Sequence, residues 1–190
     1  LKYKPIIDKV ATGSTARTDV VLAWTFKVTN FTQMQFDPAQ APPKVPTPND
    51  LAISAATGLV NAPVDDAGTP AQQEFTRDYL NTLNGFPVSA TGTAEVLGGD
   101  LDPDTLTADT VFVVPLEGGD LAGDPVLSYD TTTKTLKIAP PNGTWGKSRK
   151  LALVVIGGPN GVKKVGGGRV VGTTTWALVR SASTLVICTD

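Results

Sequence analysis

Three aspartates at alternating positions are the strongest candidate for chemistry in this sequence: Asp100, Asp102 and Asp104. Carboxylate oxygens are the ligands that Ca²⁺ prefers, and this spacing offers three of them. An EF-hand loop also needs Gly at its sixth position and Glu at its twelfth, and this stretch has neither. The aspartates therefore fit a solvated turn better than a calcium site, and we predict no metal, cofactor or catalytic residue.

Acid–base and nucleophilic catalysis find little support in the composition. The 190 residues contain no histidine, which removes Ser-His-Asp and Cys-His arrangements, and no G-x-S-x-G motif occurs. Gly166, Gly167 and Gly168 lack the Lys and Ser or Thr of a phosphate-binding loop and predict a hairpin turn. We therefore expect a protein that is not an enzyme.

Two aromatic side chains could bind a sugar, since an exposed ring offers a flat apolar platform. Trp145 follows a turn at Asn142-Gly143, and Tyr129 ends an apolar run. Packing of Trp145 against the end of the fold is the favoured alternative. The lone Cys188 forms no disulfide within the chain; it is a buried strand residue, a free thiol or a partner for a cysteine elsewhere.

The charge and hydropathy patterns limit the partners. The formal charge is −2 and no basic run exceeds two residues, so we expect no nucleic-acid binding. No apolar run approaches the ~20 residues that span a bilayer. Because Leu1 is not an initiator Met, we expect a processed product or a fragment, and a lost signal sequence stays open.

Short β-strands separated by Gly, Pro, Asn and Asp turns dominate the second half. Seven such strands indicate an all-β, immunoglobulin-like sandwich. The last long one, residues 169–180, has a near-copy at residues 19–28, where Val20, Leu22, Trp24 and Phe26 alternate with other residues. The predicted strands are residues 90–97, 110–116, 126–129, 135–138, 150–156, 169–180 and 184–188.

One amphipathic helix is predicted at about residues 70–84. Thr69 and Gln72 form a capping box around Pro70, and Gly85 is the expected left-handed stop. Phe75, Tyr79, Leu80 and Leu83 share one stripe, which we expect to cover one end of the sandwich.

The predicted organisation has three parts. Residues 1–36 are the closing strands of a preceding or shared β-module, and residues 51–190 are the sandwich with its helical segment. Between them, residues 37–50 hold five prolines, which favours an extended linker over a long loop within one domain. Whether residues 1–30 pair within this chain, with a lost module or with another subunit stays open.

Residues 45–180 resemble a known family on their turn and strand landmarks. The chain is similar to the bacterial Ig-like domain of S-layer proteins and surface lipoproteins, and to the N-terminal module of secreted lipase-like lipoproteins. Arg149-Lys150 replaces a usual Tyr of the family, which is a departure from its pattern. The landmarks are Leu101-Asp102-Pro103, Thr105-Leu106, Thr110-Val111, Thr135-Leu136-Lys137-Ile138, Pro140, Gly161-Val162, Gly168 and Trp176.

The resemblance implies a secreted protein at the bacterial cell surface. We expect a non-catalytic structural, adhesion or assembly unit of a surface protein or filament, pairing by its strands with neighbouring Ig-like modules or with copies of itself. An accessory domain of a secreted lipase-like hydrolase and a carbohydrate-binding module are the alternatives.

Overall fold

The computed structural model describes residues 4–11, 16–22, 25–27 and 31–182. The chain divides into two compact units, Leu1–Asn30 and Phe31–Asp190. In the smaller unit, the described residues form helix α1 (Lys4–Val10) and the 3₁₀ turn η1 (Arg17–Asp19). Lys4 Nζ lies 2.8 Å from Asp8 Oδ2, one helical turn away, and Arg17 also pairs with Asp8.

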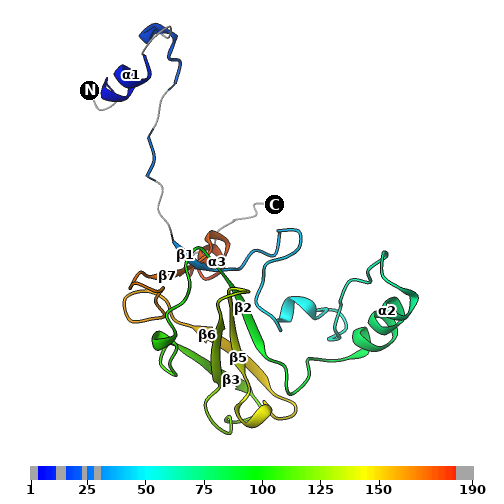
Figure 1. The fold of residues 1–190 in the computed structure, drawn as a ribbon. Helices are drawn as coiled ribbons and strands as arrows, with labels where there is room; N and C mark the ends of the chain where they lie inside the picture. Colours follow the sequence, from blue (N-terminus) through cyan, green and yellow to red (C-terminus); the bar gives the residue numbers. More distant parts are fainter. Residues whose placement is uncertain (1–3, 12–15, 23–24, 28–30, 183–190) are drawn as a thin grey trace. The chain divides into compact units, whose positions relative to one another are not determined.

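The larger unit contains two sheets (Figure 1). Five strands lie in the order β4-β5-β2-β1-β7, with β1 and β7 parallel and the other neighbours antiparallel. A second sheet pairs β3 with β6 antiparallel. The strands are β1 (Thr32–Met34), β2 (Gly92–Leu97), β3 (Val111–Glu117), β4 (Val126–Asp130), β5 (Thr135–Ala139), β6 (Lys150–Val155) and β7 (Val170–Gly172).

Both sheets contribute to one buried cluster. Val96 of β2, Val111 of β3 and Leu136 of β5 are at most 5% exposed, and β6 adds three half-buried apolar residues. The alternation of β2, with Gly92, Ala94 and Val96 buried, places one face toward this core. The unit is thus built mainly from strands, as the sequence predicts, and the predicted strands at 90–97, 110–116, 126–129, 135–138 and 150–156 are confirmed within two residues at each end.

The predicted strand at residues 169–180 is wrong beyond β7. Residues Thr174–Val179 form helix α3, which begins where the Thr173 hydroxyl accepts a hydrogen bond from Trp176 N. The same hydroxyl donates to Phe36 O at 2.6 Å, and the rings of Phe36 and Trp176 meet edge to face at 5.2 Å. The cap and this aromatic contact therefore override the β-propensity of three consecutive threonines.

The predicted strand at residues 19–28 is also wrong in its described part. Asp19 ends η1, and residues 20–22 and 25–27 have neither helix nor strand. A strand needs a neighbour for its backbone N–H and C=O groups, and the described residues of this unit supply none. The predicted strand at 184–188, Cys188 and Trp24 lie outside the described residues.

The Pro-rich residues 37–50 are hydrogen-bonded to the sheet. Thr47 N donates to Thr93 O, and Thr93 N donates back to Thr47 O at 2.7 Å. Lys44 Nζ lies 2.8 Å from Glu95 Oε2 on the same strand. These contacts describe a loop of the larger unit, whereas the sequence favoured a linker. β1, which was predicted with residues 1–36, is also a strand of this unit.

The helical segment begins as predicted and continues differently. Thr69 and Gln72 form the capping box at the start of α2 (Pro70–Glu74), which is confirmed. A single π-helical turn, η3 (Phe75–Tyr79), and a 3₁₀ turn, η4 (Leu80–Thr82), follow. Leu83 is already extended, so Gly85 is not the stop.

Short 3₁₀ turns join the remaining elements. They are η2 (Asp50–Ala52), η5 (Pro103–Thr105) and η6 (Pro141–Gly143). The predicted hairpin turn at residues 166–168 is confirmed: Lys163 bridges to Arg169, and Gly166 and Gly167 both adopt positive φ.

Candidate functional site

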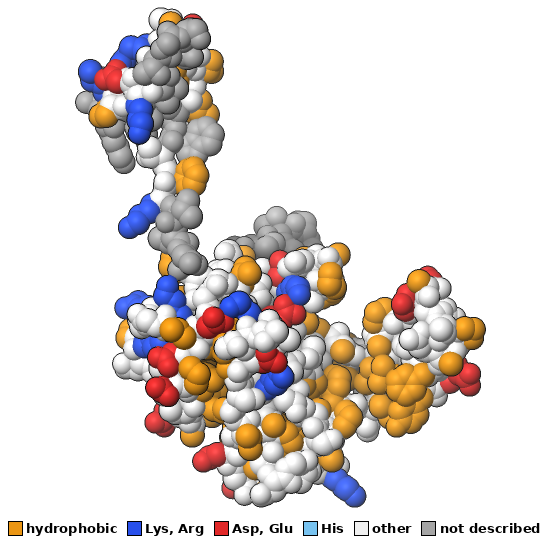
Figure 2. Space-filling model, in the orientation of Figure 1, with side chains coloured by type: hydrophobic (Ala, Val, Ile, Leu, Met, Phe, Trp, Pro, Cys, Tyr) orange, Lys and Arg blue, Asp and Glu red, His pale blue; other side chains and the backbone are white. Residues whose placement is uncertain are grey.

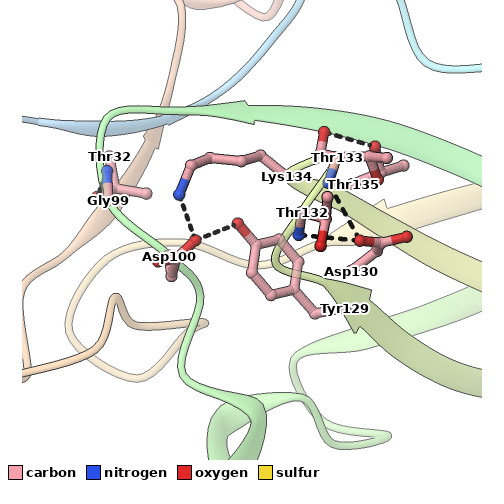
Figure 3. A network of polar contacts seen from close by, with 9 residues as sticks. All are labelled: Thr32, Gly99, Asp100, Tyr129, Asp130, Thr132, Thr133, Lys134 and Thr135. Carbon is pink, nitrogen blue, oxygen red and sulfur yellow. Dashed lines mark hydrogen bonds and ion pairs between the residues drawn. The ribbon is translucent and has the colours of Figure 1, made fainter.

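Two of the three aspartates, Asp100 and Asp102, bind donors of the chain itself. Asp100 Oδ1 accepts hydrogen bonds from Lys134 Nζ at 2.5 Å and from the Tyr129 hydroxyl at 3.1 Å (Figure 3). Asp102 caps η5 by accepting from Asp104 N at 3.2 Å. Within the described ranges, no three acidic or sulfur side chains gather into a possible metal site. The geometry is that of a turn whose carboxylates bind neighbouring donors.

Local backbone geometry brings Lys134 to Asp100. The turn between β4 and β5 closes when Asp130 Oδ1 accepts from Thr132 N and Thr133 N at 3.0 and 3.1 Å. Lys134 then adopts a left-handed φ of 52° and ends the turn. Asp100 and Lys134 are 34 positions apart, and no periodicity in the sequence links them, so the sequence analysis missed this pair.

The network holds its groups in fixed protonation states. The Lys134 hydrogen bond, more than that of Tyr129, lowers the pKa of Asp100 below its ordinary 3.8. Burial, and then the hydrogen bond to Asp100, raises the pKa of Tyr129 from 10.0 to about 12. A general acid or base works best with a pKa near the operating pH. The pKa values of Asp100 and Tyr129 both move away from neutral pH, so these two side chains suit structural support. The network joins the end of β2 to the β4–β5 turn.

Trp145 is packed into the fold. Its ring is 9% exposed, its Nε1 donates to Ala90 O at 2.6 Å and its backbone N donates to Val88 O. The predicted packing is therefore confirmed. Tyr129 is half-buried against the core, and its hydroxyl donates to Asp100.

A groove lies beside the outer edge of β3, and we call it the β3 groove. Apolar side chains of Phe112, Val113, Pro115 and Leu121 line it, together with Asp120, Gly123, Asp124 and Pro125. Its volume is about 260 Å³, which is below the ~300–1,000 Å³ typical of small-molecule sites. The lining thus combines apolar side chains with two carboxylates.

Arg149 holds the loop that forms one wall of the β3 groove. Its guanidinium donates to Gly119 O at 2.7 Å and to Asp120 O at 2.6 Å. Gly118, at φ +90°, lets the chain pass close to Ser148, because a Cβ there would lie 2.9 Å from Ser148 O. Arg149 thus has a local role: it donates hydrogen bonds to the carbonyls of this wall.

A second apolar surface lies on the helical segment. Phe75 and Tyr79 are 54% and 56% exposed and contact each other at 5.3 Å between ring centroids. With Ala71, Glu74 and Asp78 they line a hollow of about 360 Å³. Hydrophobic side chains gather around this segment in Figure 2. The prediction that this stripe covers one end of the sandwich is wrong for Phe75 and Tyr79, because both rings are more than half exposed.

Comparison of the chain with protein-family models, with curated proteins and with solved structures found no match. Among the described residues, no helix has the length and apolar character needed to cross a bilayer.

Proposed function

We propose that this chain is a non-catalytic, extracellular Ig-like module that serves as a structural, adhesion or assembly unit of a surface protein or filament. The observation that carries the proposal is the outer edge of β3, which pairs with no strand among the described residues and has an apolar groove beside it. An open edge presents N–H and C=O groups to any strand that can approach. An apolar lining adds the area that stabilises such an association.

Exposed apolar side chains on the edge strands support the same function. Leu116 of β3 and Val126 of β4 are 55% and 60% exposed, beside the free edges of the two sheets. Single exposed residues are common on soluble proteins, but apolar residues along free edges favour contact with another polypeptide. The surface-protein setting rests on the resemblance of residues 45–180 to bacterial Ig-like domains.

Light scattering and electron microscopy of the purified chain over a wide concentration range test the proposal. We expect oligomers or filaments whose size grows with concentration. A monomer at every concentration, with no binding to other Ig-like modules, contradicts the assembly function. Ester or glycoside hydrolysis by the chain alone contradicts the non-catalytic assignment.

The exposed rings of Phe75 and Tyr79 favour a second candidate, the accessory domain of a secreted lipase-like hydrolase. They form a compact aromatic surface between two acidic side chains, Glu74 and Asp78. Such a surface suits contact with a neighbouring domain. Replacing both rings by Ser then weakens binding of that domain and leaves self-association of this chain unchanged, which separates the two candidates.

A further inference from the structure

Residues 20–27 of the smaller unit have the sequence pattern of a strand, and we call them the donor segment. The described residues among them, 20–22 and 25–27, have no strand partner. Val20, Leu22, Trp24 and Phe26 alternate with other residues along the sequence. Val20 has an extended backbone, and Leu22 and Phe26 are 75% and 77% exposed. An alternating segment of this kind gains stability when it adds to a sheet edge and buries its apolar face.

The outer edge of β3 offers the backbone groups that such a segment needs. Ile156 N donates to Thr110 O, which makes this a hydrogen-bonded pair of the β3–β6 ladder. In an antiparallel ladder such pairs alternate, so the N–H and C=O of Val113 point away from β6. Pro115 also points away and has no N–H to donate, and Val111 N already donates to Thr107 O. The added pairing is therefore short and centres on Val113.

The β3 groove extends the buried core outward. Val113 and Leu121 line the groove and also pack against the core cluster. An apolar side chain that enters the groove therefore adds to an existing core.

The charges of the two units are complementary. Residues 1–30 contain five Lys or Arg and two Asp or Glu, a formal charge of +3, whereas residues 31–190 contain eleven and sixteen, a charge of −5. Asp120 and Asp124 line the β3 groove, and Lys27 ends the donor segment. Opposite charges of this kind favour the encounter of one copy with another.

We propose that the donor segment of one copy pairs with the outer edge of β3 in a second copy and places the Leu22 side chain in the β3 groove. This inference rests on the proposed assembly function and specifies which two surfaces meet when copies associate. Each copy carries one donor segment and one β3 groove, so the contact is head to tail and builds a ring or an open chain of subunits.

Association of matched variants of the full 190-residue chain tests the contact. Leu22→Asp places a charge on the apolar face of the donor segment, and Thr25→Asp places the same charge on the opposite face. Leu22→Asp raises the dissociation constant by about tenfold or more, the factor that burial of one Leu supplies, while Thr25→Asp leaves self-association within about twofold. Circular dichroism and thermal unfolding check that both variants keep the fold.

Disulfide trapping locates the acceptor, in a Cys188→Ser background. A chain with Leu22→Cys is mixed with a differently tagged chain that carries Leu121→Cys, and the matched control carries Val126→Cys on β4. We expect a mixed disulfide with Leu121→Cys and much less with Val126→Cys. A chain carrying both Leu22→Cys and Leu121→Cys should link between copies.

The outcomes separate this contact from the proposed function. Oligomers that persist in Leu22→Asp, or that are trapped through Val126→Cys, overturn the contact and leave the assembly function. A disulfide only within one chain shows that the segment pairs with its own copy, which also overturns the contact. A wild-type monomer at all concentrations that also binds no other Ig-like module overturns both.

Discussion

β2 and the donor segment have the same sequence pattern and different structures. In β2, Gly92, Ala94 and Val96 alternate with more exposed residues and are buried against the core. In the donor segment, Leu22 and Phe26 follow the same period of two and are exposed. β2 has β5 on one side and β1 on the other, whereas the described part of the smaller unit contains no strand. The comparison teaches that alternation marks a sequence able to form a strand, and that a partner decides whether it does.

β2 is held in the sheet by contacts with several other segments. Its residues pair with β5 from Gly92 to Glu95 and with β1 at Val96 and Leu97. Thr93 also pairs with Thr47 of the Pro-rich loop, and Asp100 just beyond the strand binds Lys134. The described residues of the donor segment pair with no strand of this kind.

The largest expected difference comes from the same charge placed in each region. Val96→Asp buries an unpaired carboxylate in the core and should lower the free energy of unfolding by at least about 3 kcal/mol. Leu22→Asp, at a 75% exposed position, should change it by less than about 0.5 kcal/mol. Urea denaturation followed by tryptophan fluorescence measures both. Equal losses of stability would mean that the two regions are buried alike.

The turn that follows β2 passes close to Phe31, just before β1, and sharpens the comparison. Gly98 has φ +99°, and a Cβ there would lie 2.4 Å from Phe31 O. Gly98→Ala should therefore cost about 1–3 kcal/mol by displacing β1 from β2. Gly119→Ala is the matched control, with φ +80° and no atom within 4 Å of the added Cβ. If both variants lose equal stability, backbone strain alone is responsible and the approach of Phe31 contributes nothing.

A smaller effect is expected where the Pro-rich loop meets β2. The hydroxyls of Thr47 and Thr93 lie 2.7 Å apart across a bridge between the two segments. Thr93→Val keeps the shape and removes this hydrogen bond, and should lower the free energy of unfolding by about 0.2–1 kcal/mol. A double-mutant cycle with Thr47→Val measures the coupling. A coupling of zero would show that this loop adds no side-chain stabilisation to β2.

The smallest effect is a pH dependence at the end of β2. The folded pKa of Tyr129 is raised from 10.0 to about 12, so its contribution to stability is complete below pH 10 and is lost as the pH rises toward 12. For Asp100 the pKa is lowered, so its contribution is present above 3.8 and is lost as the pH falls through the folded value.

Tyrosinate absorbance, compared between the wild type and Tyr129→Phe, isolates the titration of Tyr129. Asp100→Asn removes the carboxylate and should move that titration to lower pH, because the second largest cause of the raised pKa is lost. A Tyr129 titration at its ordinary pKa in the wild type would contradict the hydrogen bond to Asp100.

Local patterns predicted the parts of the fold whose partners lie close in sequence or whose burial repeats with a simple period. The strands β2 to β6 follow from alternating or continuous apolar runs between Gly and Asp turns. The start of α2 follows from Thr69, Pro70 and Gln72, because a capping box is satisfied within four residues. The packing of Trp145 was predicted from the residue type, although its acceptor, Ala90 O, was not.

Long-range contacts account for the failures. Helix α3 replaces the end of a predicted strand because Thr173 and Trp176 contact Phe36, 137 positions from Thr173. The outward rings of Phe75 and Tyr79, the β3 groove and the Asp100–Lys134 pair likewise depend on segments that meet only in the folded chain.

The sequence by itself determined which stretches can form strands and where the helical segment begins. Those properties are local, since they depend on side-chain period, turn residues and composition. The tertiary structure decided which alternating stretch received a partner, because backbone hydrogen bonds and apolar burial become favourable only when a second surface is in place. For this chain, β2 has that surface within its own unit, and the donor segment is left with an apolar face to bury.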